Sequence, residues 1–341
     1  MAPVNTRALP LAPPGALLVA NGKQALSLVA QDLREQGVRT VLAPDFYCLT
    51  MIQPFQLEGI RVRHVATDSR GLLDPDALAL ELATGNQLAV LHCEVFGALA
   101  GGRLRAVLTA AQAAGVRVVV DATHSLFAGS HGPGDYLVAS LRKLLPLPDG
   151  AFVTGLAHRP ALVRHDADRT ATRLGLAAAR RRHDLVAGTG SAADFVDAVD
   201  AAEDAMLEAR EPAAMSRAAL DRLSRVDAQA LRRARRANAS YLVERLVSSG
   251  IEVVNPTTPE CGVVVQVDEA RSVERDLLAA GILCPISWPR PPGLRNDVPW
   301  PSRWVTLPVD PDVTRDTLEC AAAIVERATV PFSGIDPHQG R

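Results

Sequence analysis

Residues 116–154 read VRVVVDATHSLFAGSHGPGDYLVASLRKLLPLPDGAFVT, and the fold and chemistry that we expect of the chain follow from this segment. The run Val118 to Val120 is typical of a buried parallel strand, and it ends on Asp121. A second apolar stretch ends on Ser140, shortly before Lys143. Open α/β sheets bind ligands at the carboxyl ends of their strands. The segment therefore predicts a site at this edge of a sheet that contains both Asp121 and Lys143.

Lysine is rare in this chain. Lysine and arginine together number 36, but only Lys23 and Lys143 are lysines. The abundance of Ala, Arg, Leu and Val is typical of GC-rich genes, and that bias alone favours arginine. Arginine cannot replace a lysine that must lose its proton and react as an amine. We therefore interpret Lys143 as a chemical group, and the compositional bias is compatible with that interpretation.

Two motifs, Asp-Ala-Thr-His at 121–124 and Ser-Leu-Arg-Lys at 140–143, resemble the cofactor site of fold-type I pyridoxal-phosphate (PLP) aminotransferases. The resemblance is closest to the sugar-aminotransferase group of DegT/DnrJ type, and the Ser-x-x-Lys spacing is similar to that of class V enzymes. It extends over most of the chain. It implies pyridoxal 5'-phosphate as cofactor and an α/β fold, with a mainly parallel seven-stranded sheet in a large domain and a small α+β C-terminal domain.

The resemblance also implies roles for individual residues. Lys143 would form the Schiff base with the cofactor, and Asp121 would pair with its pyridine nitrogen. His124 matches the position where the family has His or Gln near the ring oxygen. Ser140 is expected to reach a phosphate oxygen, although the sugar group usually has this serine five positions before the lysine. Arg142 either assists in binding the phosphate or faces solvent.

A further part of the expected cofactor site is the stretch Asn21, Gly22 and Lys23, which precedes an amphipathic segment. Free backbone N–H groups and the helix dipole make such a helix start an anion site, but an ordinary helix start capped by Asn21 explains the same pattern. Glycine spacing and Gln24 exclude a P-loop, which needs Ser or Thr after its lysine. The family has Ser-Gly-Thr here, so Lys23 either adds a charge to the phosphate site or points elsewhere.

The family also has an aromatic residue that stacks on the cofactor ring, in the loop that follows Pro44 here. Tyr47 is the first candidate for this role and Phe46 is the second. Because large aromatic rings are mostly packing residues, burial of both rings in the core is an equal alternative. His92 ends another expected strand, and both a catalytic role and a buried structural role are open for it.

Strands alternate with helices along the chain, which predicts a mainly parallel sheet. Residues 156–235 read as charged helical segments, and the run 232–236 resembles the start of the long helix that joins the two domains of this family. We expect four parts in total: a lead-in over 1–15, a large PLP-binding domain over 16–235, a small C-terminal domain over 236–330 and a flexible tail over 331–341.

Composition excludes several classes of function. The net charge of −2 and the aromatic content of 4% give no basis for binding nucleic acid. No apolar run reaches the roughly eighteen residues of a membrane span, and prolines interrupt the N-terminal stretch where a signal peptide needs apolar residues. The five cysteines show no CxxC or Cys/His spacing, so we predict no metal site and expect a reduced, cytoplasmic protein.

The expected function is that of an aminotransferase with a small-molecule amino donor and acceptor. A donor carboxylate needs a cation, and Arg290 and Arg303 are the candidates. Only about twenty residues precede the expected phosphate turn, fewer than in the sugar group, so we weigh an amino acid or a natural-product precursor equally with a keto sugar. Another PLP reaction, of the decarboxylase, lyase or aldolase type, and a catalytically silent protein of this fold are the alternatives.

A homodimer with the site at the subunit interface is expected for two reasons. Fold-type I enzymes are typically dimers whose partner chain completes the cofactor site. In addition, the residues that can be assigned to the cofactor cover one side of it, so a partner arginine from residues 157–235 is expected to supply further contacts. Twofold dimers are also the commonest oligomers.

Overall fold

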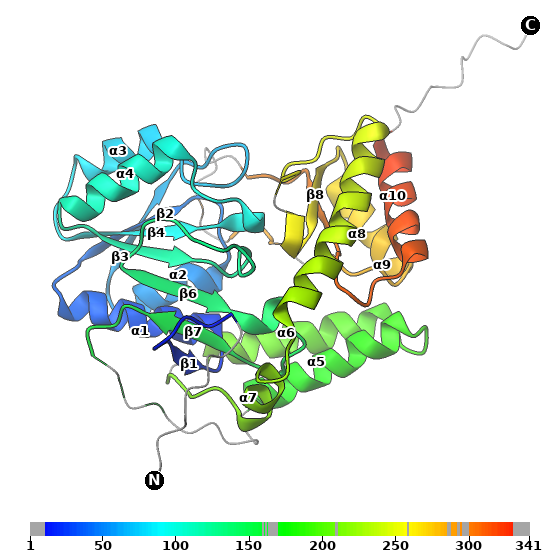
Figure 1. Cartoon of the computed structure of the whole chain (residues 1–341), viewed down its shortest axis with the longest axis horizontal. Coiled ribbons are helices and arrows are strands. Elements are labelled where there is room, and N and C mark those ends of the chain that lie inside the picture. Colours follow the sequence, from blue (N-terminus) through cyan, green and yellow to red (C-terminus); the bar gives the residue numbers. More distant parts are fainter. Residues whose placement is uncertain are drawn as a thin grey trace, which may run out of the picture.

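The computed structural model describes residues 11–158, 160, 162, 170–208, 211–257, 259–284, 288–291, 294 and 300–329. Figure 1 shows a large α/β body that begins near the N-terminus and a smaller body near the C-terminus, with the long helix α8 (Ala228–Ser248) leading from one to the other. Residues 1–10 and 330–341 lie outside the described residues, and so do most of the expected lead-in and the expected flexible tail.

A seven-stranded sheet forms the centre of the large body, in the order β1-β7-β6-β5-β4-β2-β3. Strands β2 to β6 run parallel to one another, and β7 is antiparallel to both of its neighbours. The strands are β1 (Leu17–Val19), β2 (Thr40–Pro44), β3 (Arg61–Val65), β4 (Leu88–Cys93), β5 (Arg117–Asp121), β6 (Tyr136–Ser140) and β7 (Ala151–Thr154). The mainly parallel seven-stranded sheet expected from the sequence is confirmed.

Helices cover both faces of this sheet, as a parallel sheet requires. Figure 1 shows α1 and α2 on one face and α3 and α4 on the other. All six residues of β4 are buried, which explains why that strand has no alternation of polar and apolar residues. The helices are α1 (Gly22–Glu35), α2 (Leu49–Leu57), α3 (Pro75–Leu82) and α4 (Gly102–Ala113).

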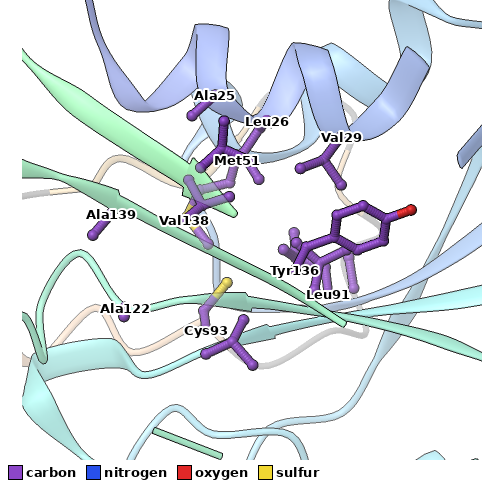
Figure 2. Packing of buried hydrophobic residues seen from close by; sticks show 14 of the residues in the cluster. Ala25, Leu26, Val29, Met51, Leu91, Cys93, Ala122, Tyr136, Val138 and Ala139 are labelled. Atoms are coloured by element: carbon purple, nitrogen blue, oxygen red, sulfur yellow. The ribbon is translucent and has the colours of Figure 1, made fainter. Parts of the chain in front are cut away.

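The buried face of α1 fixes that helix to the sheet. Figure 2 shows Ala25, Leu26 and Val29 of α1 pointing toward Val138 of β6 and Leu91 of β4. The three helix residues follow the spacing that brings side chains onto one helix face. All five side chains are almost completely buried. This packing holds the amino end of α1 beside the carboxyl ends of the central strands.

Helices α5 (Thr170–Val186) and α6 (Ala192–Glu208) pack against each other as an antiparallel pair, which Figure 1 shows next to the large body. The shorter α7 (Arg217–Leu223) follows, and α8 leads toward the smaller body. The helical character expected for residues 156–235 is confirmed for α5, α6, α7 and the start of α8, whereas residues 156–158 and 211–216 are not helical.

The smaller body contains a two-stranded antiparallel sheet, β8 (Val263–Gln266) and β9 (Trp304–Leu307). Helices α9 (Ala270–Ala279) and α10 (Arg315–Thr329) pack with it, and the 3-10 turn η3 (Pro259–Cys261) precedes it. Most of its buried apolar side chains form a cluster separate from that of the large body, whereas Cys261 and Val264 belong to the cluster of the large body. On this ground we continue to propose a large domain over 16–235 and a small one over 236–330. Among the described residues, no helix combines the length and the apolar character needed to cross a bilayer.

Candidate active site

A cavity of about 1610 Å³ opens at the carboxyl ends of β5 and β6 and at the amino end of α1. Residues of α5 and α6 and the segment around Trp288 form its other walls. Most of the residues that the sequence analysis assigns to the cofactor line this cavity, namely Asn21, Gly22, Lys23, Asp121, His124, Ser140 and Lys143. The cavity lies where open α/β sheets bind ligands.

Asp121 is the last residue of β5, and its carboxylate is buried at the floor of the cavity. One carboxylate oxygen, Oδ1, accepts a hydrogen bond from the Thr123 N–H at 2.9 Å. Burial raises the pKa of Asp121, while the bonds from Thr123 and the positive charge of Lys143 act in the opposite direction. A buried carboxylate in this position is suited to bind a cationic or protonated group of a ligand.

Lys143 is the last residue of η2 (Leu141–Lys143), a single 3-10 turn directly after β6. The first two N–H groups of this turn donate to the Gly150 carbonyl at 2.9 and 3.2 Å. Gly150 has a φ of 125°, and a Cβ there would lie 2.3 Å from the Met215 methyl carbon, so glycine allows this close return of the chain. The turn is therefore tied to the start of β7, and the exposed side chain of Lys143 lines the cavity.

His124 is buried beside Asp121, and its ring is fixed on two sides. Its Nδ1 accepts a hydrogen bond from the Phe96 N–H at 3.3 Å, and the Trp288 ring lies 5.6 Å away. Burial and the charge of Lys143 hold the pKa of His124 well below its usual value. The ring is therefore neutral, and because Nδ1 accepts, the proton is on Nε2 and can be donated to a ligand.

The amino end of α1 forms a cradle for an anion. Asn21 caps the helix by accepting from the Gln24 N–H at 3.0 Å, so the capping role considered for it is present. A Cβ at Gly22 would lie 3.2 Å from the Ser140 Cβ, so a side chain here would fill the space between the helix start and β6. The helix dipole and the uncovered N–H groups favour a phosphate at this point. These residues fit the phosphate end of PLP, with Asp121 and Lys143 further along the cavity.

Lys23 makes a contact that the sequence could not reveal. Its side chain is 4% exposed, and its ammonium donates to the Met206 carbonyl in the last turn of α6 at 2.9 Å. Arg142 reaches the same helix, with Nη2 at 3.3 Å from a Glu203 carboxylate oxygen and 3.1 Å from the Met206 sulfur. Both cations therefore hold α6 over the cavity, and a cation at a helix C-terminus is favourable.

Several expected site residues lie elsewhere. Tyr47 is buried and stacks on His64, with ring centroids 4.6 Å apart, and it does not line the cavity. Phe46 is buried among Phe96 and three tryptophan rings, so both aromatic candidates are packing residues. Arg303 pairs with Asp268 at the surface of the smaller body. Arg290, the other arginine predicted to bind a donor carboxylate, does not line the cavity either. The prolines on either side of it do line the cavity.

Other cavity residues were missed by the sequence analysis. Cys48, which directly follows Tyr47, lines the cavity at the start of α2. Glu94 directly follows β4, so the rule that identified Asp121 would have identified it as well. Three arginines of the helical region, Arg180, Arg182 and Arg222, also line the cavity, but nothing in the sequence separates them from solvent-facing arginines.

Glu94 binds the segment between β5 and β6 to the end of β4. Its Oε2 accepts from His131 Nδ1 at 2.7 Å and from the Ser125 hydroxyl, and its Oε1 accepts from the Gly132 N–H at 3.1 Å. Burial tends to raise the pKa of Glu94, but the bonds from His131 and Ser125 outweigh it and lower the pKa below its usual value. The carboxylate is therefore a structural anion that ties residues 125–132 to the end of β4.

His92 is fully buried in β4 and does not line the cavity. Neither ring nitrogen has a hydrogen-bond partner among the described residues. Burial lowers the pKa of His92 to about 4, because the imidazolium cannot be solvated there; Glu94 opposes this shift. Of the two roles considered for His92, the arrangement supports the buried structural one.

The buried histidine predicts a loss of stability in mild acid. In the unfolded chain His92 takes up a proton near its ordinary pKa of 6.5, whereas in the folded chain it stays neutral down to about pH 4. The unfolded state therefore binds more protons in this window, and the free energy of unfolding should fall as the pH is lowered from 6.5 to 4, by at most about 1.4 kcal/mol per pH unit for this group. Urea unfolding at several pH values measures the slope.

His92→Leu should remove part of this slope. Equal slopes for the wild type and His92→Leu would contradict the assignment. The remaining slope includes His124, whose pKa is also lowered by burial.

Comparison with known proteins supports the fold. Neither the known protein families nor the curated protein sequences contain a match to this chain. Three solved structures each match 92% of it: the aminotransferase TlmJ from Streptoalloteichus hindustanus (17% identity, 85% of that chain, TM-score 0.63), a DegT DnrJ EryC1 StrS aminotransferase from Brucella abortus (18%, 85%, 0.58) and the sugar aminotransferase CalS13 from Micromonospora echinospora (22%, 87%, 0.59). The chain therefore has the fold of fold-type I PLP-dependent aminotransferases, as its motifs implied.

Proposed function

We propose that this protein is a PLP-dependent aminotransferase. The observation that carries the proposal is the arrangement of Asp121, Lys143 and the amino end of α1 around one cavity. These three features match the three parts of PLP that a protein must hold: the pyridine nitrogen, the aldehyde and the phosphate. The fold, which is that of aminotransferases of this class, adds support.

Bound PLP would supply an electron sink for the bonds at the substrate's α-carbon. The protein's part is to bind, orient and move protons. The Asp121 carboxylate would keep a proton on the pyridine nitrogen, and the neutral His124 ring would donate from Nε2 to the ring oxygen. The backbone N–H groups at Gly22 and the Ser140 hydroxyl would hold the phosphate. The Lys143 amine is the group that would hold the cofactor's aldehyde carbon, and as a free amine it would accept and donate a proton beside the substrate.

Three arginines of the cavity wall are suited to bind a substrate. Since Arg290 and Arg303 are not part of that wall, we propose Arg180, Arg182 and Arg222 as the candidates for a substrate's anionic group. A keto sugar is favoured because CalS13, one of the matched proteins, is a sugar aminotransferase, and a natural-product precursor is the alternative.

The test is to incubate the purified protein with PLP and to follow its absorbance while amino donors are added one at a time. A characteristic absorbance of the attached cofactor, lost on adding a donor and restored by a keto acceptor, is the expected result. No attached cofactor would contradict the proposal. Attachment with release of carbon dioxide, or with cleavage of the substrate, would indicate a decarboxylase, lyase or aldolase, and attachment without any turnover would indicate a silent protein of this fold.

We further propose that the enzyme is cytoplasmic, on the ground that its five cysteines are free thiols. We also propose a homodimer, because fold-type I enzymes are typically dimers. The cavity already contains arginines of residues 157–235 from its own chain, so the expected need for a partner arginine is weaker. An obligate interface should bury more than about 2,000 Å².

Light scattering at micromolar concentration should give the mass of two chains. If Arg180 acts in the site of the partner subunit, mixing the inactive variants Lys143→Ala and Arg180→Ala should restore up to about a quarter of the activity, because half of the sites in each mixed dimer are intact. Mixing Lys143→Ala with Asp121→Asn provides the control, since both residues belong to the same chain's site. A monomer that keeps its cofactor and full activity would contradict the dimer.

A further inference from the structure

A buried arginine connects the smaller body to the turn that carries Lys143. Arg235, on α8, is only 2% exposed, and it is the largest of the fully buried side chains in the described part of the chain. It does not line the cavity, and the chemistry proposed above makes no use of it. Burying a guanidinium is costly unless its charge and its N–H groups have partners, so its contacts identify what it holds.

Its hydrogen bonds go to three separate segments, and its guanidinium also lies 6.0 Å from the centroid of the Phe127 ring, while Nε has no hydrogen-bond partner among the described residues. Nη1 of Arg235 donates to the Glu260 carbonyl of η3 at 3.2 Å, and Nη2 donates to the Leu144 carbonyl at 3.2 Å. Nη2 also donates to the carboxylate of Asp310, which follows β9. A planar guanidinium can donate hydrogen bonds in several fixed directions at once, whereas the ammonium group of lysine is a single point charge on a flexible stem.

Asp310 is itself fixed, so the contact with Arg235 has little freedom. Asn238, one turn further along α8, donates to the Asp310 carbonyl at 2.9 Å. Arg182 of α5 lies 3.7 Å from the second carboxylate oxygen of Asp310. Because Asp310 and Arg182 both line the cavity, Arg235 is connected through them to the cavity wall.

The bond to Leu144 bears directly on the reactive lysine. Leu144 is the residue after Lys143, and its carbonyl belongs to the peptide unit that follows the turn η2. The other anchor of this turn, the Gly150 carbonyl, binds the N–H groups of the first two residues of η2. Arg235 is thus the anchor on the far side of Lys143, and the two anchors together fix the direction in which the lysine side chain leaves the backbone.

We propose that Arg235 is a positioning residue for Lys143: it holds the lysine-bearing turn against the smaller body, so that the amine meets the aldehyde of a bound cofactor. This inference rests on the proposed function. The reaction concerned is the condensation of the Lys143 amine with the aldehyde, in which the C=N bond forms and one water molecule leaves. Arg235 would affect this step and not the strength with which the cavity holds the cofactor.

The experiment separates covalent attachment from non-covalent binding. Attachment is measured as the rate at which borohydride-trapped PLP accumulates on Lys143, identified by mass spectrometry. Non-covalent binding is measured as the dissociation constant of PLP for Lys143→Ala and for Lys143→Ala with Arg235→Lys. Arg235→Lys keeps the buried charge but cannot serve all three partners, and attachment should slow about tenfold to a hundredfold. The dissociation constant in the Lys143→Ala background should change by less than about twofold.

Arg232→Lys is the matched control. Arg232 lies one turn earlier on α8 and also connects the helix to η3, through a bond of 3.1 Å to the Glu260 carboxylate, but it does not contact Leu144. It should leave the attachment rate within about twofold of the wild-type rate, because partly exposed ion pairs contribute little. A parallel loss of attachment and of non-covalent binding in Arg235→Lys, or an equal slowing in Arg232→Lys, would overturn the proposal by giving Arg235 a general structural role.

A milder variant covers the case in which Arg235→Lys does not fold. Asn238→Ala removes the bond that fixes Asp310, and should slow attachment in the same direction but less. No change in this variant would overturn the proposal as well. A wild-type protein that attaches no PLP to Lys143 is a different result, because it would reject the proposed function itself.

Discussion

Replacing Lys143 with alanine is expected to abolish covalent attachment of PLP and to lower turnover by roughly 10⁴- to 10⁶-fold. Lys143 ends the turn η2, lines the cavity and affects the titration of both Asp121 and His124 through its charge. Alanine removes the amine without altering the backbone bonds to Gly150 that hold the turn. Absorbance of the attached cofactor and borohydride labelling followed by mass spectrometry measure the effect.

Lys23→Ala is the control for this experiment, because Lys23 is the other lysine of the chain. Its ammonium donates to the Met206 carbonyl of α6, so its removal should weaken the hold on α6 while labelling of Lys143 persists. Labelling that survives in Lys143→Ala, or that appears on Lys23 in the wild-type protein, would reject the assignment of the Schiff-base lysine.

The second large effect is expected at Asp121. Asp121→Asn should leave the cofactor bound but cut turnover by roughly 10²- to 10³-fold, because a neutral amide cannot stabilise a proton on the pyridine nitrogen. The lost charge-assisted bond should weaken binding of the cofactor by only about 1.5–3 kcal/mol. The asparagine oxygen can still accept the bond from the Thr123 N–H, so the local backbone should be retained. Steady-state turnover and a PLP titration separate the two effects.

Asp135→Asn is the matched control. Asp135 lies at the opposite end of the same strands, where it pairs with Arg117 at 3.0 Å and accepts from the Val118 N–H at 2.8 Å. Asp135 binds residues at the amino end of β5, whereas the cavity lies at the carboxyl end of this strand. Asp135→Asn should therefore lower the stability of the fold more than it lowers turnover. An Asp121→Asn enzyme with near wild-type turnover would refute the role of the carboxylate.

The sheet and the two central site residues could be predicted because local patterns determine them. The valines before Asp121 identify a strand with two buried faces. In an open parallel sheet, ligands bind at the carboxyl ends of such strands, so the residue at the strand end is expected to lie at the site. The same reasoning applies to Lys143 after β6. Each inference uses only a strand, its direction and the next residues, and all of these are encoded within a few positions of sequence.

The residues that were placed elsewhere depend on partners far away in the sequence. Tyr47 does not line the cavity, and its ring stacks instead on His64 of β3. Arg303 lies at the surface of the smaller body, where Asp268 pairs with it. Lys23 binds the end of α6, and its partner Met206 lies 183 residues further along the chain. No local sequence pattern predicts these contacts, because the residues that form them are brought together only by the complete fold.

The pairing of β1 with β7 has a consequence for how the chain folds during its synthesis on the ribosome. β1 precedes the other strands of this sheet in the chain, yet its register partner, β7, comes after all of them, and Val19 also bridges to Ala214 beyond α6. The helix start that would bind phosphate follows β1 directly, so it cannot be completed while the chain is still short. Cofactor can stabilise only a state that it binds. If the proposed site binds PLP, the cofactor would therefore stabilise a growing chain only after most of the large domain has been synthesised.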